Sequence, residues 1–264
     1  MSRPRAGYIG FNRDPAAGAE SAPGVWTLRE AEAARRAGTW PGSPDPYFSN
    51  VSLLLHMDGT NGSTSFPDTS GSPKSVTAGG SAAVSTASSK FGGASVRIPA
   101  SSYLEVSGSG LTPSGDFALE LWANFDSTGS HYVMVQSFWT GGGWALWQHP
   151  DYPGKASFWV WNYSNSSPLM VSTTSFTAGV WTYIAVSRSG NAWNLYFNGT
   201  REATVTNSAS ISQPLLRVGS YRDSSTVSVA SMIGYQDDVR LTLQTARGYT
   251  GASITVPTAA FSNS

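Results

Sequence analysis

The chain contains no cysteine among its 264 residues, which excludes disulfide bridges and cysteine-ligated metals. Charged residues make up 12% of the chain and the formal net charge is zero. A chain without a basic balance is poorly suited to nucleic acid as its main partner. No apolar run reaches the roughly 18 residues of a membrane helix, and residues 1–10 lack the apolar core of a signal peptide. We therefore expect neither nucleic acid nor a membrane as partner.

Short hydrophobic segments separated by glycine, serine and asparagine are abundant instead. The clearest is residues 181–199, in which two alternating strands flank a polar turn. Alternation predicts that Ile184 and Val186 face one side of a sheet and Tyr183 the other. Asn198-Gly199 predicts a tight type I′ turn, because both residues tolerate positive φ. One hairpin is marginal in water, so the segment requires a larger sheet around it.

The rest of the chain supplies strands for that sheet. They are expected at residues 51–57, 94–98, 103–106, 117–125, 131–138, 143–148, 156–163, 168–172, 202–206, 215–218 and 231–242. Strands recurring about every 8–12 residues, with polar turns between them, indicate an all-β, antiparallel two-sheet sandwich. Residues 59–89 hold few bulky side chains and read as loops.

Residues 1–46 differ from this pattern and are predicted to form an N-terminal arm. Residues 1–23 show no periodicity and are expected to be extended. Thr27 and Glu30 match a capping box, which predicts one short helix that stops at Gly38. The expected organisation is therefore an arm over 1–46, a sandwich over 47–250 and a small polar tail over 251–264.

Several segments, in this order and spacing, carry a family resemblance. They are LLLHMDG (53–59), SKFGGASVRI (89–98), YLEV (103–106), DFALELWANF (116–125), WTYIAVSRSGNAWNLYFNG (181–199) and LLRVGSY to IGYQDDVRL (215–241). Together they resemble the concanavalin A-like lectin/glucanase superfamily, in its laminin G-like branch. The resemblance implies a jelly roll of two packed antiparallel sheets, one concave and one convex.

A second resemblance concerns the arm. GVWTLREAEAARRAGTWP (24–41), followed by DPYFSNVSLLLHMDG (45–59), is similar to structural proteins of tailed bacteriophages, where it precedes the same sandwich. It implies a virion protein: a capsid decoration, a short head fibre or a compact tail adhesin. Other virion proteins would be partners, and a homo-oligomer, which we take as a trimer, would suit multivalent display. The residues expected to dock it are Arg3, Arg5, Arg13, Trp26, Leu28, Arg35, Arg36 and Trp40, although the arginines are equally consistent with solubility.

A catalytic carboxylate pair is the first candidate site. The resemblance implies that glycan-cleaving relatives carry Glu-x-Asp-x-x-Glu on one strand, which places acid and nucleophile on one face. Here Glu120 is the only acid in residues 117–125 and has no acidic partner at Trp122 or Asn124. None of the three histidines lies in a nucleophile motif. We therefore read Glu120 as a structural polar group and expect no enzymatic activity.

A metal is the second candidate. The resemblance implies one Ca²⁺ where the first and last strands meet, and the matching acids are Asp58 and Asp237, with Asp238 beside them. Oxygens from the 59–64 loop could complete the six to eight ligands that Ca²⁺ prefers. The alternative is that Asp58 caps a turn and Asp238 pairs with a cation such as Arg240.

An aromatic surface for sugars is the third candidate. Half of the ten tryptophans fall within residues 139–161, and alternation puts Trp159 and Trp161 on one face. Flat rings pack against sugar C–H groups while polar neighbours meet the hydroxyls. The candidate glycan-binding residues are Trp147, His149, Asp151, Trp159, Trp161, Asn162 and Tyr163. The alternative is that these rings are buried, since tryptophans in sandwiches usually fill the interior. Trp122 and Trp181 are assigned to the core.

These observations favour a non-enzymatic phage surface protein. Its arm would dock it to the virion, and its lectin-like sandwich would adhere to host or environmental glycans. Two alternatives stay open: a carbohydrate-binding module of a glycan-degrading protein, and a glycan hydrolase.

Overall fold

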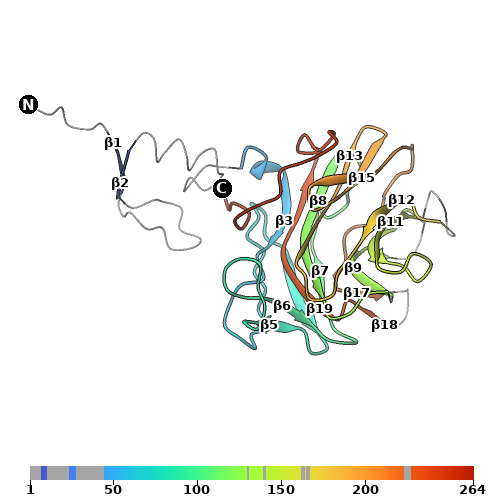
Figure 1. Ribbon diagram of the computed structural model, residues 1–264, viewed down its shortest axis with the longest axis horizontal. Coiled ribbons are helices and arrows are strands. Elements are labelled where there is room, and N and C mark those ends of the chain that lie inside the picture. The colour runs from blue at the N-terminus through green and yellow to red at the C-terminus, as the bar shows by residue number, and fades with distance from the viewer. Residues whose placement is uncertain are drawn as a thin grey trace, which may run out of the picture.

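Two antiparallel sheets lie face to face and form a sandwich (Figure 1). The computed structural model describes residues 7–10, 24–27, 45–129, 131–138, 141–161, 164, 167–222 and 227–264. Strands dominate these residues, and the described helix is a single 3₁₀ turn, η1 (Phe48–Asn50), which is neither long nor apolar enough to cross a membrane. The expected all-β jelly-roll sandwich is confirmed.

One sheet has eight strands, and β8, β13 and β19 lie at its centre. Its order is β15 (Thr200–Thr206), β14 (Ala192–Phe197), β13 (Thr182–Ser189), β8 (Phe117–Phe125), β19 (Gly234–Leu243), β6 (Ser95–Ile98) and β5 (Ala83–Ser85), with β3 (Val51–Leu55) paired to the second half of β19. The pairing of β19 with β8 has a register shift between Asp237 and Arg240; on its other side β19 pairs with β6 before this point and with β3 after it.

The other sheet has seven strands. Its order is β12 (Met170–Ser175), β11 (Lys155–Val160), β10 (Trp144–Gln148), β9 (Tyr132–Gln136), β16 (Arg217–Val218), β7 (Tyr103–Ser107) and β4 (Ser75–Gly79). Two small ribbons accompany the sandwich, β1 (Gly7–Gly10) with β2 (Gly24–Thr27), and β17 (Ser220–Arg222) with β18 (Val227–Ser231).

The main core lies between the sheets, and alternation places its side chains. In the central hairpin, Ile184 and Val186 enter the core, whereas Tyr183 joins a cluster on the opposite face of the eight-stranded sheet. Asn198 and Gly199 have φ of 47° and 81°, so the predicted turn is present. Strand periodicity thus fixed the inward faces correctly.

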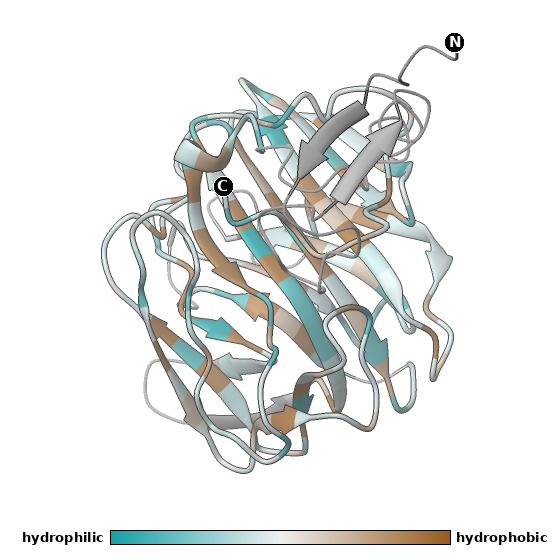
Figure 2. Ribbon diagram, turned by 90° about the vertical axis from the view of Figure 1, so that its left-hand side faces the viewer, coloured by the Kyte–Doolittle hydropathy of each residue, from teal (hydrophilic) through white to brown (hydrophobic). Residues whose placement is uncertain are grey.

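The C-terminal segment, residues 244–264, covers the outer face of the eight-stranded sheet, which Figure 2 views. Its Phe261 is buried, and Tyr249, Ile254 and Val256 pack on the same cluster. Trp122 belongs to this outer cluster and Trp181 is only partly buried against it. The assignment of Trp122 to the core is confirmed, in this second cluster, and Trp181 packs against that cluster without being fully buried. They lie on the face that alternation assigns to Tyr183.

Residues 59–89 also differ from expectation, because they contain β4 and β5. Both strands are short and weakly hydrophobic, but Val84 is buried and Val76 packs against the core. The predicted helix lies outside the described residues. So do the side chains expected to dock the arm, including Trp26, whose backbone alone is described within β2.

Candidate functional site

Aromatic side chains gather on the outer face of the seven-stranded sheet, away from the main core. We call them the outer aromatic cluster: Trp147, Trp159, Trp161, His131, His149, Tyr152 and Tyr221. Strand register explains the separation. Trp159 is opposite Ala145 on this face, whereas Trp144 is opposite Val160 and faces the main core. The prediction that Trp159 and Trp161 share a face is confirmed.

The tryptophans form the floor of this cluster rather than its surface. Trp147, Trp159 and Trp161 are 0%, 2% and 5% exposed. Trp147 packs edge-on against Trp159 with 5.7 Å between ring centroids, and Tyr221 stacks parallel to Trp147 with 6.0 Å between ring centroids. A flat, open tryptophan surface is therefore absent from the described part of this face.

Half-buried groups make up what this face presents to solvent. His149, Tyr152 and Tyr221 are each partly exposed, and Asp151 is exposed. Asn162 and Tyr163 lie outside the described residues. The buried tryptophans hold the exposed rings in place, so the surface is aromatic with a polar rim.

The two histidines of the cluster are poised to stay neutral. Burial, followed by the charge of the neighbouring His149, lowers the pKa of His131 to about 4. Burial also lowers the pKa of His149, although Asp151, 3.4 Å away, opposes that shift. Nε2 of His131 is buried and has no hydrogen-bond partner among the described residues. Neutral imidazoles can both donate and accept, as sugar hydroxyls require.

A polar group that was not predicted from the sequence lies on the same sheet face. Arg217 on β16 pairs with Glu105 on β7 at 2.9 Å, and its guanidinium lies 3.7 Å from the ring centre of Tyr103. The available signal was the alternation of Arg217 with the core residue Val218, which places a charged side chain on an outer face.

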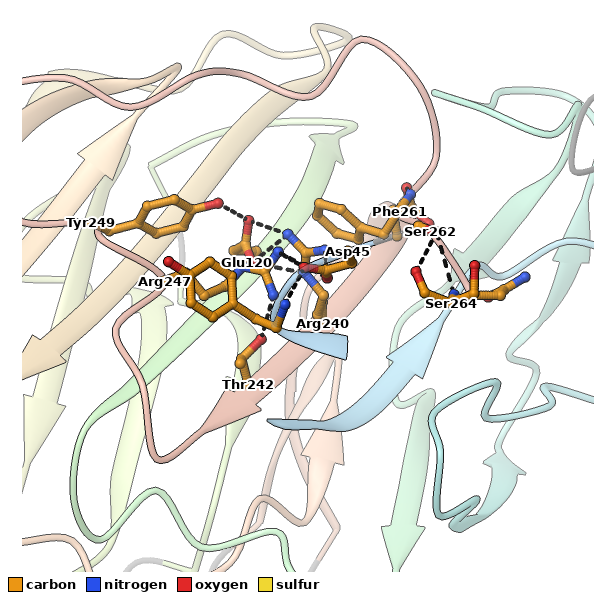
Figure 3. Close-up of polar contacts among 12 residues, drawn as sticks. Asp45, Glu120, Arg240, Thr242, Arg247, Tyr249, Phe261, Ser262 and Ser264 are labelled. Atoms are coloured by element: carbon orange, nitrogen blue, oxygen red, sulfur yellow. Dashed lines mark hydrogen bonds and ion pairs between the residues drawn. The ribbon is translucent and has the colours of Figure 1, made fainter. Parts of the chain in front are cut away.

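Glu120 lies in a buried network beneath the C-terminal segment (Figure 3). It is fully buried and accepts from Arg240, from Tyr183 at 2.7 Å and from Tyr249 at 2.8 Å. Burial, with the Glu120 charge next in order, raises the pKa of Tyr249 to about 12. Glu120 is thus a structural group, as expected, in a central strand. Its two oxygens are occupied by cations and hydroxyls.

Asp45 completes that network. It accepts from Arg240 at 3.0 Å and from Arg247 at 2.8 Å, and its backbone N–H donates to the Ser264 carbonyl. Two arginines therefore face two carboxylates under the segment that covers the sheet, so the buried charge is balanced.

The carboxylates predicted to bind Ca²⁺ are placed near one another by the 90–94 loop. Asp237 Oδ2 accepts from the N–H groups of Lys90 and Phe91, and Asp58 accepts from that of Ala94. Burial is the main cause that raises the pKa of Asp237 to about 8; the hydrogen bonds from Lys90 and Phe91 oppose the rise, and the charges of Asp238 and Asp58 contribute to it.

Part of this site fits a cation. Oδ1 of Asp58 and Oδ1 of Asp237 are both buried without a hydrogen-bond partner in the described part of the chain. No third carboxylate or imidazole joins them in ligating geometry among those residues. Asp238 instead bonds His56 at 2.6 Å and the N–H of Phe261. The pair could supply two oxygens, and the remaining Ca²⁺ ligands would have to be backbone or water oxygens.

The two-sheet fold defines the class of protein: a lectin-like β-sandwich. The family model described as "Concanavalin A-like lectin/glucanases superfamily", Laminin_G_3, matches residues 99–243, which is more than half of the chain. The chain belongs to this family. No curated protein matches it.

Solved structures agree on the fold. Domain 4 of AbnA, a GH43 extracellular arabinanase from Geobacillus stearothermophilus in complex with arabinotriose, is 16% identical over 74% of this chain and 92% of its own, with a TM-score of 0.54. The binding domain of botulinum neurotoxin DC in complex with SialylT is 13% identical over 74% of this chain and 48% of its own, at 0.52. A Trypanosoma rangeli sialidase in complex with 2,3-difluorosialic acid is 10% identical over 79% of this chain and 32% of its own, with a TM-score of 0.51.

Proposed function

We propose that this protein is a non-enzymatic glycan-binding module that uses the outer face of the seven-stranded sheet. The observation that carries the proposal is the outer aromatic cluster, in which buried tryptophans support the partly exposed rings of Tyr221, Tyr152 and His149. Exposed aromatic faces beside uncharged polar groups suit sugars, which combine apolar C–H faces with hydroxyls. The complex of AbnA domain 4, which has a similar fold, with arabinotriose also supports the proposal.

A non-enzymatic role is supported by the surroundings of Glu120. Its carboxylate is fully buried and bound by Arg240, Tyr183 and Tyr249, and Trp122 occupies the position where a second acid would be needed. Retaining and inverting glycosidases both need a pair of carboxyl groups facing the substrate. A hydrolase using Glu120 would first have to remove the C-terminal segment.

The same proposal places the module on a phage virion, docked through residues 1–46 and assembled as a symmetric oligomer such as a trimer. Its support is the sequence resemblance of residues 24–59 to tailed-phage structural proteins. Multivalent display would raise the avidity of weak sugar contacts. Loss of particle incorporation after removal of residues 1–46, with the sandwich still folded, tests this part independently. Normal incorporation would contradict it.

Glycan binding itself is tested with Tyr221→Ala and Tyr152→Ala on a glycan array and by calorimetry. Both rings are partly exposed, so the variants should fold, and we expect affinity to fall by about tenfold, or about 1.4 kcal/mol. Tyr235→Ala is the matched control, a half-buried tyrosine on the eight-stranded sheet. Binding of no glycan by the wild type, or equal losses in all three variants, would refute the proposed site.

A further inference from the structure

Arg217 lies in the same row of residues as the aromatic cluster. Register places Trp159 opposite Ala145, Ala145 opposite Gln136, and Gln136 opposite Arg217. These three steps cross neighbouring strands, which are about 4.8 Å apart, so Arg217 and Trp159 are separated by roughly 15 Å along one face. A ligand that spans several sugar units could extend from the partly exposed rings of the aromatic cluster to the partly exposed Glu105, which pairs with Arg217.

The guanidinium of Arg217 is held rigidly by its neighbours. Its Nε and Nη2 donate to Glu105 Oε2 at 3.3 and 2.9 Å, and its plane lies over Tyr103. Tyr103 in turn lies over Gly79, where an added Cβ would come within 2.3 Å of the ring. The absence of a side chain at Gly79 therefore makes room for Tyr103, which supports Arg217.

One donor of this fixed group is unused. Arg217 is 2% exposed, and its Nη1 is buried without a hydrogen-bond partner. Leaving a buried, charged N–H unpaired is unfavourable, and native structures rarely do so without a reason. A ligand oxygen is a partner that would satisfy it.

The net charge of the Arg217–Glu105 pair decides which kind of ligand oxygen can bind Nη1 of Arg217. Glu105 already neutralises Arg217, so a second carboxylate or a sulfate would meet an acidic neighbour. A hydroxyl or ring oxygen carries no such penalty and accepts from Nη1. The group therefore selects uncharged oxygens.

We propose that Arg217, Glu105 and Tyr103 form a subsite for an uncharged sugar unit, next to the aromatic cluster. This inference rests on the proposed glycan-binding function and names its ligand class as neutral glycans. Arg217 donates to a sugar hydroxyl or ring oxygen, Glu105 keeps the site neutral, and Tyr103 positions Arg217.

The test uses the full chain and a glycan array that carries uronic-acid glycans beside their carboxyl-reduced, neutral counterparts. Wild type should prefer the neutral member of each pair. Arg217→Lys keeps the charge but loses the guanidinium fork, and should weaken neutral-glycan binding about tenfold. Gly79→Ala, which displaces Tyr103, should weaken it in the same direction. Glu105→Gln should shift preference toward the acidic member.

Arg97→Lys is the matched control, because Arg97 also pairs with a carboxylate, Asp126, and stacks on a tyrosine, Tyr235, but on the eight-stranded sheet. It should leave binding unchanged. Thermal unfolding of each variant separates misfolding from lost contacts, and Glu105→Gln, at a partly exposed position, keeps the test available if Arg217→Lys unfolds. Tyr221-dependent binding with Arg217→Lys unaffected would overturn the subsite alone. Wild-type preference for the acidic member would also overturn it, and no binding at all would overturn both proposals.

Discussion

Arg240 hydrogen-bonds both carboxylate oxygens of Glu120: its Nε donates to Oε2 at 2.8 Å and its Nη2 donates to Oε1 at 2.9 Å. The two residues lie on neighbouring central strands, β19 and β8, directly opposite each other. Their side chains are 5% and 0% exposed, so this is a buried, two-pronged ion pair. Such a pair fixes how the C-terminal segment meets the sheet, because Tyr249 and Arg247 also reach Glu120.

Glu120→Gln should therefore destabilise the protein strongly. The amide keeps the shape but leaves Arg240 and Arg247 short of a countercharge, and breaking a buried pair costs about 3–5 kcal/mol. Urea denaturation measures the loss. Asp126→Asn, in the partly exposed Arg97–Asp126 pair, is the control and should cost no more than about 1 kcal/mol. Similar losses in the two variants would show that burial of the Glu120 pair is immaterial.

Phe261→Ala should loosen the C-terminal segment. Phe261 is 7% exposed, packs in the outer cluster and lies 3.7 Å beneath the Arg240 guanidinium. Large-to-small changes at such sites cost about 3–5 kcal/mol. Hydrogen exchange should rise at the N–H of Phe261, which donates to Asp238. Val180→Ala, at a residue 49% exposed, should change neither quantity. An unchanged denaturation midpoint for Phe261→Ala would show that the packing of the C-terminal segment does not contribute to stability.

Ca²⁺ should stabilise the protein by binding Oδ1 of Asp58 and Oδ1 of Asp237, which are buried without hydrogen-bond partners in the described part of the chain. A ligand at 100 times its Kd adds about 2.7 kcal/mol, and each kcal/mol raises Tm by about 2–4 °C in a chain of this size. Calorimetry in Ca²⁺ against EDTA measures the shift, with Mg²⁺ as the comparison ion. Asp237→Asn should abolish it. No shift with Ca²⁺ in the wild type would refute the site.

Glu202 should make stability depend on acid pH. It accepts from the backbone and side chains of Thr173 and Thr174, and links β15 to β12 across the two sheets. Burial raises the pKa of Glu202, but these hydrogen bonds outweigh it and lower the pKa below the usual 4.5. The stabilisation is thus present above pH 4.5 and is lost as pH falls through the lowered pKa.

Glu202→Gln should consequently cost about 1 kcal/mol at pH 7, since the site is solvent-screened, and nothing once wild-type Glu202 is protonated. Denaturation midpoints of both proteins from pH 7 to pH 3 check this, and the two curves should converge at the acid end. A difference in denaturation midpoint that stays constant from pH 7 to pH 3 would show that the Glu202 carboxylate is not the source of the stabilisation.

Much of the fold was predictable because apolar and polar residues alternate along many of its strands. Residues 117–125 were predicted as a strand and are one, with Leu119 and Leu121 inward. β4 and β5 were missed because their side chains are small, and their pairing depends on neighbours distant in sequence. Local pattern alone does not report such pairing.

The candidate site was predictable only in part. Alternation placed Trp159 and Trp161 together, but burial of an outer face depends on what packs over it, which one strand does not encode. Similarly, residues 251–264 look small and polar, yet Phe261 and the Asp45–Ser264 contact make them part of the sheet's cover. Arg217 was not predicted as a site residue because its role depends on an ion pair with Glu105, which lies 112 positions away in the sequence.

The Glu202 contact has a consequence beyond the stability of one molecule. β12 is the edge of the seven-stranded sheet, and edges offer free amides that recruit strands from other chains. Here the amides of Thr173 and Thr174 are already taken by a carboxylate. Copies crowded side by side would find little to hydrogen-bond along that stretch, so dense arrays could form without fusing into continuous sheets.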